Sequence, residues 1–389
     1  MARTHALPAR RGFLKSLAAL SAAGLARTTR AAAAVPPLKI ERIEAIKVVV
    51  PMRPGVVMSE NYPNMDIRLR DFDKYPKFIL KMYAGDGLLG LGETGREVPE
   101  AGVKANIAHL MGKNLAQLDL ASPSLGLPDA RTADAFEIAI YDLMGKVLGL
   151  PVHALLGGRM QDKVAVSYWT GQRTDADLVR VGQRAVELGF KNLKFKARLG
   201  DPIDKQLAAV ATANPGLSFI VDFNSSYPNP ASFLQMAQRL QGYNLIIEDP
   251  VPKRLEWFRQ LRERLTIPFA ITPGGGQQMF EAVRAKACDV LNLGGNMRSF
   301  VRSCYFAELA GLPVWHGSGV ELGIRDMSFI QAAAATRSCT IPSDTLCYMR
   351  ESDLLATPFR VVNGFITVPT TPGLGVDLDE AALKRFRVA

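Results

Sequence analysis

The chain has 389 residues, of which 48% are hydrophobic and 22% charged, which is the composition of a folded globular protein with a large core. Residues 1–34 contain six Lys or Arg and no Asp or Glu, so the rest of the chain keeps 41 basic against 37 acidic residues and a net charge of +4 instead of +10. A surplus of that size does not argue for a nucleic-acid partner, and it is compatible with a small anionic substrate.

The first 34 residues contain, in order, the parts of a twin-arginine (Tat) export signal. Arg10-Arg11 is followed by an Ala/Leu-rich run from Leu17 to Ala26 and then by four alanines, Ala31 to Ala34, typical of a cleavage region. The apolar run is too short to remain in a bilayer as an anchor. We therefore expect a Tat-exported, periplasmic protein without a stable membrane anchor; a disordered basic tail is the alternative.

The cysteines give little support to a metal or redox site. None of the four belongs to a Cys-x-x-Cys pair, which argues against zinc. In an oxidising periplasm Cys339 and Cys347 could form a disulfide, because both lie in a loop-like stretch. Cys288 and Cys304 are expected to be buried free thiols.

The segment after the export signal predicts an α+β domain. Alternating apolar residues indicate strands at 38–50, 78–83 and 88–92, and helical spacing indicates helices at 99–111 and 132–148. We expect the acidic residues of the second helix to form its solvated face: Asp134, Glu137 and Asp142.

A long segment without periodicity, Pro51 to Asp73, separates the first two predicted strands. A loop of this length inside a compact domain is usually functional. Arg53 and Tyr62 are therefore candidates for covering a ligand, and a surface loop without that role stays open.

From Lys163 the pattern changes to strand and helix in alternation. Such a rhythm, with crossover helices between parallel strands, favours a barrel over an open sheet, and no phosphate-binding glycine motif follows the first strand. The seven strands are expected at 164–168, 192–197, 219–223, 245–248, 269–272, 289–293 and 314–316.

Three consecutive strands of this series end in charged residues. Side chains alternate along a strand, so Lys194 and Lys196 share one face, Asp222 and Asn224 share the corresponding face of the next strand, and Glu248 ends the third. The carboxyl ends of the strands carry the active site in such barrels. Two carboxylates there offer hard ligands for Mg²⁺, and a lysine near that cation should have a lowered pKa and act as a general base. Salt bridges without chemistry are the alternative.

The chain resembles the mandelate racemase/muconate lactonizing enzyme branch of the enolase superfamily across residues 38–389. The segments that carry the resemblance are Asp142–Lys146 with Gly149-Leu150-Pro151, Leu155–Arg159, Lys194-x-Lys196, Asp222-x-Asn224, Glu248-Asp249-Pro250, and Pro372–Val376 continuing through Leu383. This resemblance implies a modified (β/α)₇β TIM-type barrel at 161–355 under an α+β capping domain at 35–160. The C-terminal segment 356–389 would return to complete the capping domain.

The resemblance also implies the chemistry, namely Mg²⁺-assisted removal of the proton α to a carboxylate. Asp222 and Glu248 look like the first two metal ligands, Lys196 like the base on one face of the substrate, and Lys194 like its partner near the substrate carboxylate. His316 occupies a place where several members have an acid or base. Asn224 and Glu321, the latter near the position of an eighth-strand glutamate, are expected to bind substrate with Tyr62 and Arg53.

One expected metal ligand is missing from the sequence. The family has a third carboxylate at the end of the fifth barrel strand, where this chain has Thr272-Pro273. Loss of one anionic ligand should weaken Mg²⁺ binding strongly, unless Thr272, Asn224, Gln277 or water substitutes as a neutral ligand.

The sequence therefore predicts an enzyme that acts on a small hydroxy acid or acid sugar as a dehydratase, or as an epimerase, racemase or cycloisomerase. A non-catalytic or metal-independent relative that binds an anionic small molecule is the alternative, motivated by the missing third ligand. Many relatives in this family assemble symmetrically, so a homo-oligomer is compatible with the resemblance, although no interface can be read from the sequence.

Overall fold

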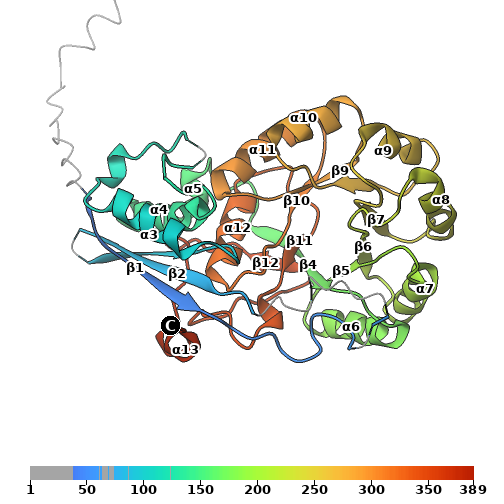
Figure 1. The fold of residues 1–389 in the computed structure, drawn as a ribbon, viewed down its shortest axis with the longest axis horizontal. Helices are drawn as coiled ribbons and strands as arrows, with labels where there is room; N and C mark the ends of the chain where they lie inside the picture. The colour runs from blue at the N-terminus through green and yellow to red at the C-terminus, as the bar shows by residue number, and fades with distance from the viewer. Residues whose placement is uncertain (1–37, 61, 64–68, 70–73, 86, 123) are drawn as a thin grey trace, which may run out of the picture. The chain divides into compact units, whose positions relative to one another are not determined.

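The computed structural model describes residues 38–389 except 61, 64–68, 70–73, 86 and 123, and Lys39–Ala389 form one compact unit (Figure 1). The predicted export signal and part of the loop after the first strand lie outside the described residues. In the part of the chain that the structure describes, no helix has the length and apolar character needed to cross a membrane.

The unit begins with an antiparallel sheet of three strands in the order β1-β2-β3, which are Ile40–Val48, Lys77–Ala84 and Leu88–Glu93. Helices α3 (Glu100–Leu110) and α4 (Ala133–Leu148) follow. The sheet and α4 are in close contact at Gly90 and Gly92, where a Cβ atom would collide with the backbone carbonyls of α4. Each element agrees with its predicted position to within two residues.

The prediction that the acidic residues of α4 form its solvated face was wrong for Glu137 and Asp142. Glu137 and Asp142 are fully buried. Glu137 forms a 2.9 Å ion pair with Arg298, and Asp142 accepts hydrogen bonds from the backbone of Leu91 and Leu374. These carboxylates therefore connect α4 to other segments of the fold, and burial is tolerated because each is hydrogen-bonded.

The barrel consists of eight parallel strands with helices around them (Figure 1). A ring of eight is expected for a TIM-type barrel, and the strand missed from the sequence is the last, β11. The strands are β4 (Lys163–Thr170), β5 (Asn192–Lys196), β6 (Ser218–Asp222), β7 (Leu245–Glu248), β8 (Phe269–Ile271), β9 (Val290–Leu293), β10 (Val314–His316) and β11 (Ser343–Thr345).

The covering helices alternate with these strands, and their apolar side chains pack on the outward faces of the strands in one large core. They are α5 (Val152–Leu155), α6 (Asp175–Glu187), α7 (Ile203–Ala213), α8 (Pro230–Arg239), α9 (Leu255–Arg262), α10 (Gly276–Arg284), α11 (Met297–Leu309) and α12 (Ile324–Ala334). A smaller cluster fills the inside of the barrel: Ile220, Ala270, Val290 and Trp315.

The end of the chain contacts both parts of the fold. Strand β12 (Phe365–Thr367) pairs antiparallel with β4, and α13 (Glu380–Phe386) follows it. Glu380 of this helix forms a 2.6 Å ion pair with Lys81 of β2. The backbone of Arg387 pairs with that of Val48 of β1 in an isolated antiparallel β-bridge. The last residues therefore lie against the N-terminal sheet; the domain boundaries themselves stay predictions.

The cysteines do not pair as the sequence had allowed. Cys288, Cys304 and Cys339 are buried free thiols, so the disulfide between Cys339 and Cys347 is not formed in the structure. Burial raises the pKa of the Cys339 thiol to about 11, which makes it unreactive at neutral pH.

Candidate active site

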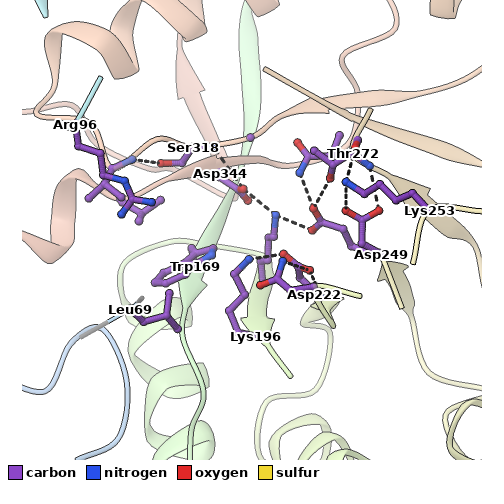
Figure 2. Close-up of a pocket in the computed structure, with 17 residues that line it drawn as sticks. Leu69, Arg96, Trp169, Lys196, Asp222, Asp249, Lys253, Thr272, Ser318 and Asp344 are labelled. Atoms are coloured by element: carbon purple, nitrogen blue, oxygen red, sulfur yellow. Dashed lines mark hydrogen bonds and ion pairs between the residues drawn. The ribbon is translucent and has the colours of Figure 1, made fainter. Parts of the chain in front are cut away.

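Polar side chains from the carboxyl ends of the barrel strands line a cavity of about 350 Å³ (Figure 2), called the mouth cavity below. Alternation along each strand explains why these side chains face the cavity. On several strands, the residue two positions before the lining residue faces the same way and fills the inside of the barrel. The polar lining consists of Lys194, Lys196, Asp222, Asn224, Glu248, Asp249, Lys253, Thr272, Asn292, Ser318, Asp344 and Arg96, and Leu69, Trp169, Gly317, Val320 and Leu346 complete it.

Lys196 and Asp222 form the first ion pair of the mouth cavity. They lie opposite each other in the register of β5 and β6, and the ammonium contacts Asp222 Oδ2. Asp222 Oδ1 accepts hydrogen bonds from the backbone and side-chain amides of Asn224, at 2.8 and 2.9 Å. Burial acts to raise the pKa of Asp222, but the two lysines outweigh it and the pKa is lowered, so Asp222 is a carboxylate at neutral pH.

Lys194 lies between two carboxylates. Its Nζ is 2.8 Å from Glu248 Oε2 and 2.8 Å from Asp344 Oδ2. Burial acts to lower the pKa of Lys194, yet Asp344, Glu248 and Asp222 outweigh it and the pKa is raised. Without a bound metal Lys194 therefore stays a cation, and the lowered pKa expected for a lysine beside Mg²⁺ stays a prediction. The side chain of Lys196 is 17% exposed against 3% for Lys194, so Lys196 is the more accessible amine.

Sequence reasoning missed Asp344. It lies on β11, whose three residues show no alternation that could mark a strand. The only signal available was indirect. An eight-stranded barrel requires one more strand after β10, and an acidic residue in the middle of a short segment there was a candidate for the inward position of that strand.

Glu248 is held by neutral donors as well as by Lys194. Its Oε1 accepts hydrogen bonds from Thr272 Oγ1 at 3.0 Å and from Asn292 Nδ2 at 2.6 Å. The next residue, Asp249, is 3.1 Å from Lys253 Nζ. Burial, followed by the charge of Glu248, raises the pKa of Asp249 to about 7.

The side chains present fit a weak divalent-cation site. Asp222 and Glu248 lie opposite each other on neighbouring strands, and the buried Oε2 of Glu248 has the ion pair with Lys194 but accepts no further hydrogen bond among the described residues. Thr272 stands where the third carboxylate was expected and offers a hydroxyl oxygen. The described residues contain no group of three His, Cys, Asp or Glu side chains that could hold a metal, so two carboxylates would have to be completed by neutral ligands or by the substrate.

The structure does not place His316 in the mouth cavity. Trp315 faces the inside of the barrel, so His316 faces the helices, where its ring stacks on Phe329 with centroids 3.5 Å apart. Both ring nitrogens lack a hydrogen-bond partner among the described residues, and burial lowers the pKa of His316 to about 3. An imidazole in this position cannot exchange protons with a substrate at the mouth.

Three further predicted substrate-binding residues are not in the lining. Glu321 lies between β10 and α12, not on the eighth strand, and its carboxylate accepts hydrogen bonds from Ser318 and Gly319. Tyr62 and Arg53 line two other cavities. Arg96, from the segment after β3, and Trp169, from β4, take part instead.

Comparison with known proteins agrees with this fold. The N-terminal domain of the mandelate racemase/muconate lactonizing enzyme family matches residues 56–157, and the enolase C-terminal domain-like family matches residues 177–382. Relatives detectable by sequence include enzymes named as racemases, cycloisomerases and a dehydratase.

Two relatives and one solved structure illustrate the likeness. D-Galactarolactone cycloisomerase of Agrobacterium fabrum is 29% identical over 82% of this chain and 93% of its own length. N-Succinylamino acid racemase of Thermus thermophilus is 30% identical over 77% and 86%. An enolase of Pseudomonas fluorescens, solved with bound magnesium, potassium and tartrate, is 23% identical, covers 90% of this chain and 92% of its own, and superposes with a TM-score of 0.75. The chain belongs to the mandelate racemase/muconate lactonizing enzyme family of the enolase superfamily and is a lyase or isomerase of that superfamily.

Proposed function

We propose that this enzyme removes the proton α to the carboxylate of a small hydroxy acid or acid sugar with one base, Lys196, and completes the reaction on that same face. The product would arise by dehydration or by cycloisomerisation, not by racemisation. The observation that carries the proposal is that, among the described residues, the strands across the barrel from Lys196 present no second basic side chain to the mouth cavity.

Racemisation needs proton donors and acceptors on both faces of the α-carbon. Across the barrel from β5, strands β9 and β10 contribute Asn292 and Gly317 to the mouth cavity, and neither titrates. His316 was the candidate for the second face, and it lies outside the cavity. These positions support chemistry on one face.

The two lysines divide the work according to their surroundings. Lys194 is buried between Glu248 and Asp344 and keeps its proton, so it would bind the substrate carboxylate and the negative charge that develops there. Lys196 is more exposed to the cavity and has one carboxylate partner, Asp222, so it would accept the α-proton. Asp222 and Glu248 would hold Mg²⁺, which would supply charge stabilisation to the enolic form of the substrate carboxylate.

The relatives support the substrate class. They are named for muconate, galactarolactone, galactonate and N-succinylamino acids, which are carboxylates or their lactones. The charged and polar lining of the mouth cavity, with Arg96 from the N-terminal part and Lys253 from the barrel, suits an anionic substrate.

The test is incubation of purified protein with a panel of hydroxy acids and acid sugars in D₂O with Mg²⁺, followed by NMR. We expect dehydration, cyclisation or α-deuteration in a single configuration, and loss of turnover by at least about 10³-fold in Lys196→Ala. Lys384→Ala, an exposed lysine of α13, is the matched control. Exchange in both configurations would contradict the single base, and saturable binding of these acids without any exchange would favour the non-catalytic alternative.

A further inference from the structure

A second cavity of about 550 Å³, called the α6 cavity, lies on the outer side of β4. It is bounded by α6, by the segment after β1 and by η2 (Cys347–Met349); Figure 1 shows the blue segment after β1 passing α6. Its lining contains four arginines and one carboxylate: Arg53, Arg173, Arg180, Arg184 and Asp177. Two tyrosines, Tyr168 and Tyr348, stack with ring centroids 4.2 Å apart and complete it with apolar residues.

Arg173 is the central charge of the α6 cavity. It is 5% exposed and donates hydrogen bonds to Thr170 Oγ1 and to the carbonyl oxygens of Gly55 and Val56. All three acceptors are neutral, and three of the five guanidinium N–H groups are used. Burial lowers the pKa of Arg173 to about 10, so it remains a cation at neutral pH. The carboxylate that partly offsets this charge, Asp177, is shared with Arg180. A buried charge that is only partly compensated is costly, which favours an anion in the adjoining space.

The Tyr168 hydroxyl provides a second polar group. Tyr168 is 4% exposed, lines the α6 cavity, and its hydroxyl has no hydrogen-bond partner among the described residues. Burial raises the pKa of this phenol, while the nearby charges of Arg173 and Arg184 oppose the shift. The hydroxyl is therefore an O–H donor beside two guanidinium groups.

The arginines of α6 form the outer edge. Arg180 and Arg184 are four residues apart on one helix face, a like-charge pair that repels unless an anion lies between. The single carboxylate of the lining, Asp177, already accepts from Ser59 and Arg180, and Arg184 pairs with Glu187 at 3.1 Å near the surface. The lining thus keeps an excess of positive charge.

We propose that the α6 cavity is a binding site for a small anion with two or more negative charges, a phosphate ester or a polycarboxylate. Arginine forks and a tyrosine O–H match the oxygens of either group. This site is separate from the mouth cavity, because Tyr168 and Trp169 are consecutive residues of β4 and face opposite sides. The two sites are nevertheless connected, since the Tyr348 hydroxyl bonds to the backbone N–H and C=O of Trp169 at 2.6 and 2.8 Å.

The experiment is calorimetric titration of the full chain with inorganic phosphate, pyrophosphate and citrate in magnesium-free buffer. We expect saturable one-site binding of pyrophosphate or citrate below millimolar concentration. The double variant Arg180→Gln/Arg184→Gln and the single variant Tyr168→Phe should each weaken binding by roughly 10-fold or more, as loss of charge-assisted hydrogen bonds predicts. Tighter binding of pyrophosphate identifies a phosphate ester as the ligand class, and tighter binding of citrate a polycarboxylate.

Two controls separate the site from general charge effects and from the mouth cavity. Arg337→Gln/Arg385→Gln removes the same charge from exposed positions elsewhere, and Lys196→Ala removes a cation from the mouth cavity. Both should leave the affinity within about twofold. The proposal is overturned if either control weakens anion binding as much as the α6-cavity variants do. It is also overturned if none of the three anions shows saturable binding at roughly 5 mM.

Discussion

The ammonium of Lys194 lies 2.8 Å from Asp344 Oδ2, and this contact joins the second strand of the barrel to the eighth. Asp344 is buried and its other oxygen, Oδ1, accepts no hydrogen bond among the described residues. The ion pair with Lys194 is therefore the main compensation for burying this carboxylate, whose pKa is raised by desolvation in spite of the lysine.

Asp344→Asn is expected to lower the pKa of Lys194, because one of the two carboxylates in contact with the ammonium loses its charge. It should also lower the free energy of unfolding by about 1–3 kcal/mol, less than for a fully broken pair since Glu248 remains in contact. Titration of labelled lysine by NMR and urea unfolding measure the two effects. Asp162→Asn, an exposed ion-pair residue, should change stability by less than about 0.5 kcal/mol. An unchanged Lys194 pKa would contradict the assignment of Asp344 as its partner.

Because His316 is buried, the protein is expected to become less stable in acid. The unfolded chain takes up a proton on this residue below its ordinary pKa of about 6.5, whereas burial lowers the folded pKa to about 3. The unfolded state binds more protons in this window, so stability from His316 is complete above pH 6.5 and is lost as the pH falls toward 3. The loss amounts to about 2 kcal/mol at pH 5.

His316→Phe is the variant that tests this pH dependence. A phenyl ring should fit between Phe300 and Phe329, since His316 already packs against both rings. Urea unfolding between pH 7 and 5 should show a smaller acid slope for the variant than for the natural chain. Identical slopes would mean that His316 accepts a proton in the folded state, and the claim that it cannot reach solvent or substrate would fail.

Strand rhythm and alternation predicted most of this fold. Every barrel strand from β4 to β10 was located to within about two residues, because each is a short apolar run between helical segments. β11 was missed because three residues, Ser-Asp-Thr, carry no apolar alternation. Its formation depends on closure of the barrel, which is a tertiary property.

The same alternation accounts for what the sequence showed of the mouth cavity. It correctly placed Lys194, Lys196, Asp222, Asn224 and Glu248 together, but their roles stay predictions. Applied to β10, the same alternation would have placed His316 on the outward face of the strand, because Trp315 faces the inside of the barrel. The burial of Glu137 and Asp142 could not be read from a helix alone, since their partners are far apart in sequence.

We propose that the chain is exported through the Tat pathway, and the twin arginines make this testable. Arg10→Lys/Arg11→Lys should leave the uncleaved precursor in the cytoplasm, because the receptor recognises the arginine pair. The measurement is immunoblotting of periplasmic and cytoplasmic fractions. Arg27→Lys/Arg30→Lys alters two arginines outside the pair and should be exported normally. Periplasmic protein from the Arg10/Arg11 variant would contradict a Tat signal.

Removal of the Lys196 side-chain charge is expected to strengthen Mg²⁺ binding, whereas a lysine that only supports the structure would leave the affinity unchanged or weaken it. The ammonium of Lys196 contacts Asp222 Oδ2, so a cation at Asp222 and Glu248 must compete with it. Lys196→Met removes the competitor and one repelling charge, and we expect Mg²⁺ affinity to rise by about 10-fold, which corresponds to roughly 1.4 kcal/mol. Asp222→Asn should abolish binding in the millimolar range, because it leaves a single anionic ligand.

Calorimetric titration of the natural chain and these variants with MgCl₂ measures the Mg²⁺ affinities to be compared. Lys384→Met removes the same charge from the exposed face of α13 and should leave the affinity unchanged. Weaker binding in Lys196→Met would show that the lysine supports the cation site instead of competing with it. Such a result would also mean that a bound cation does not displace the Lys196 ammonium from Asp222, and the neutral amine that a general base needs would have to arise in another way.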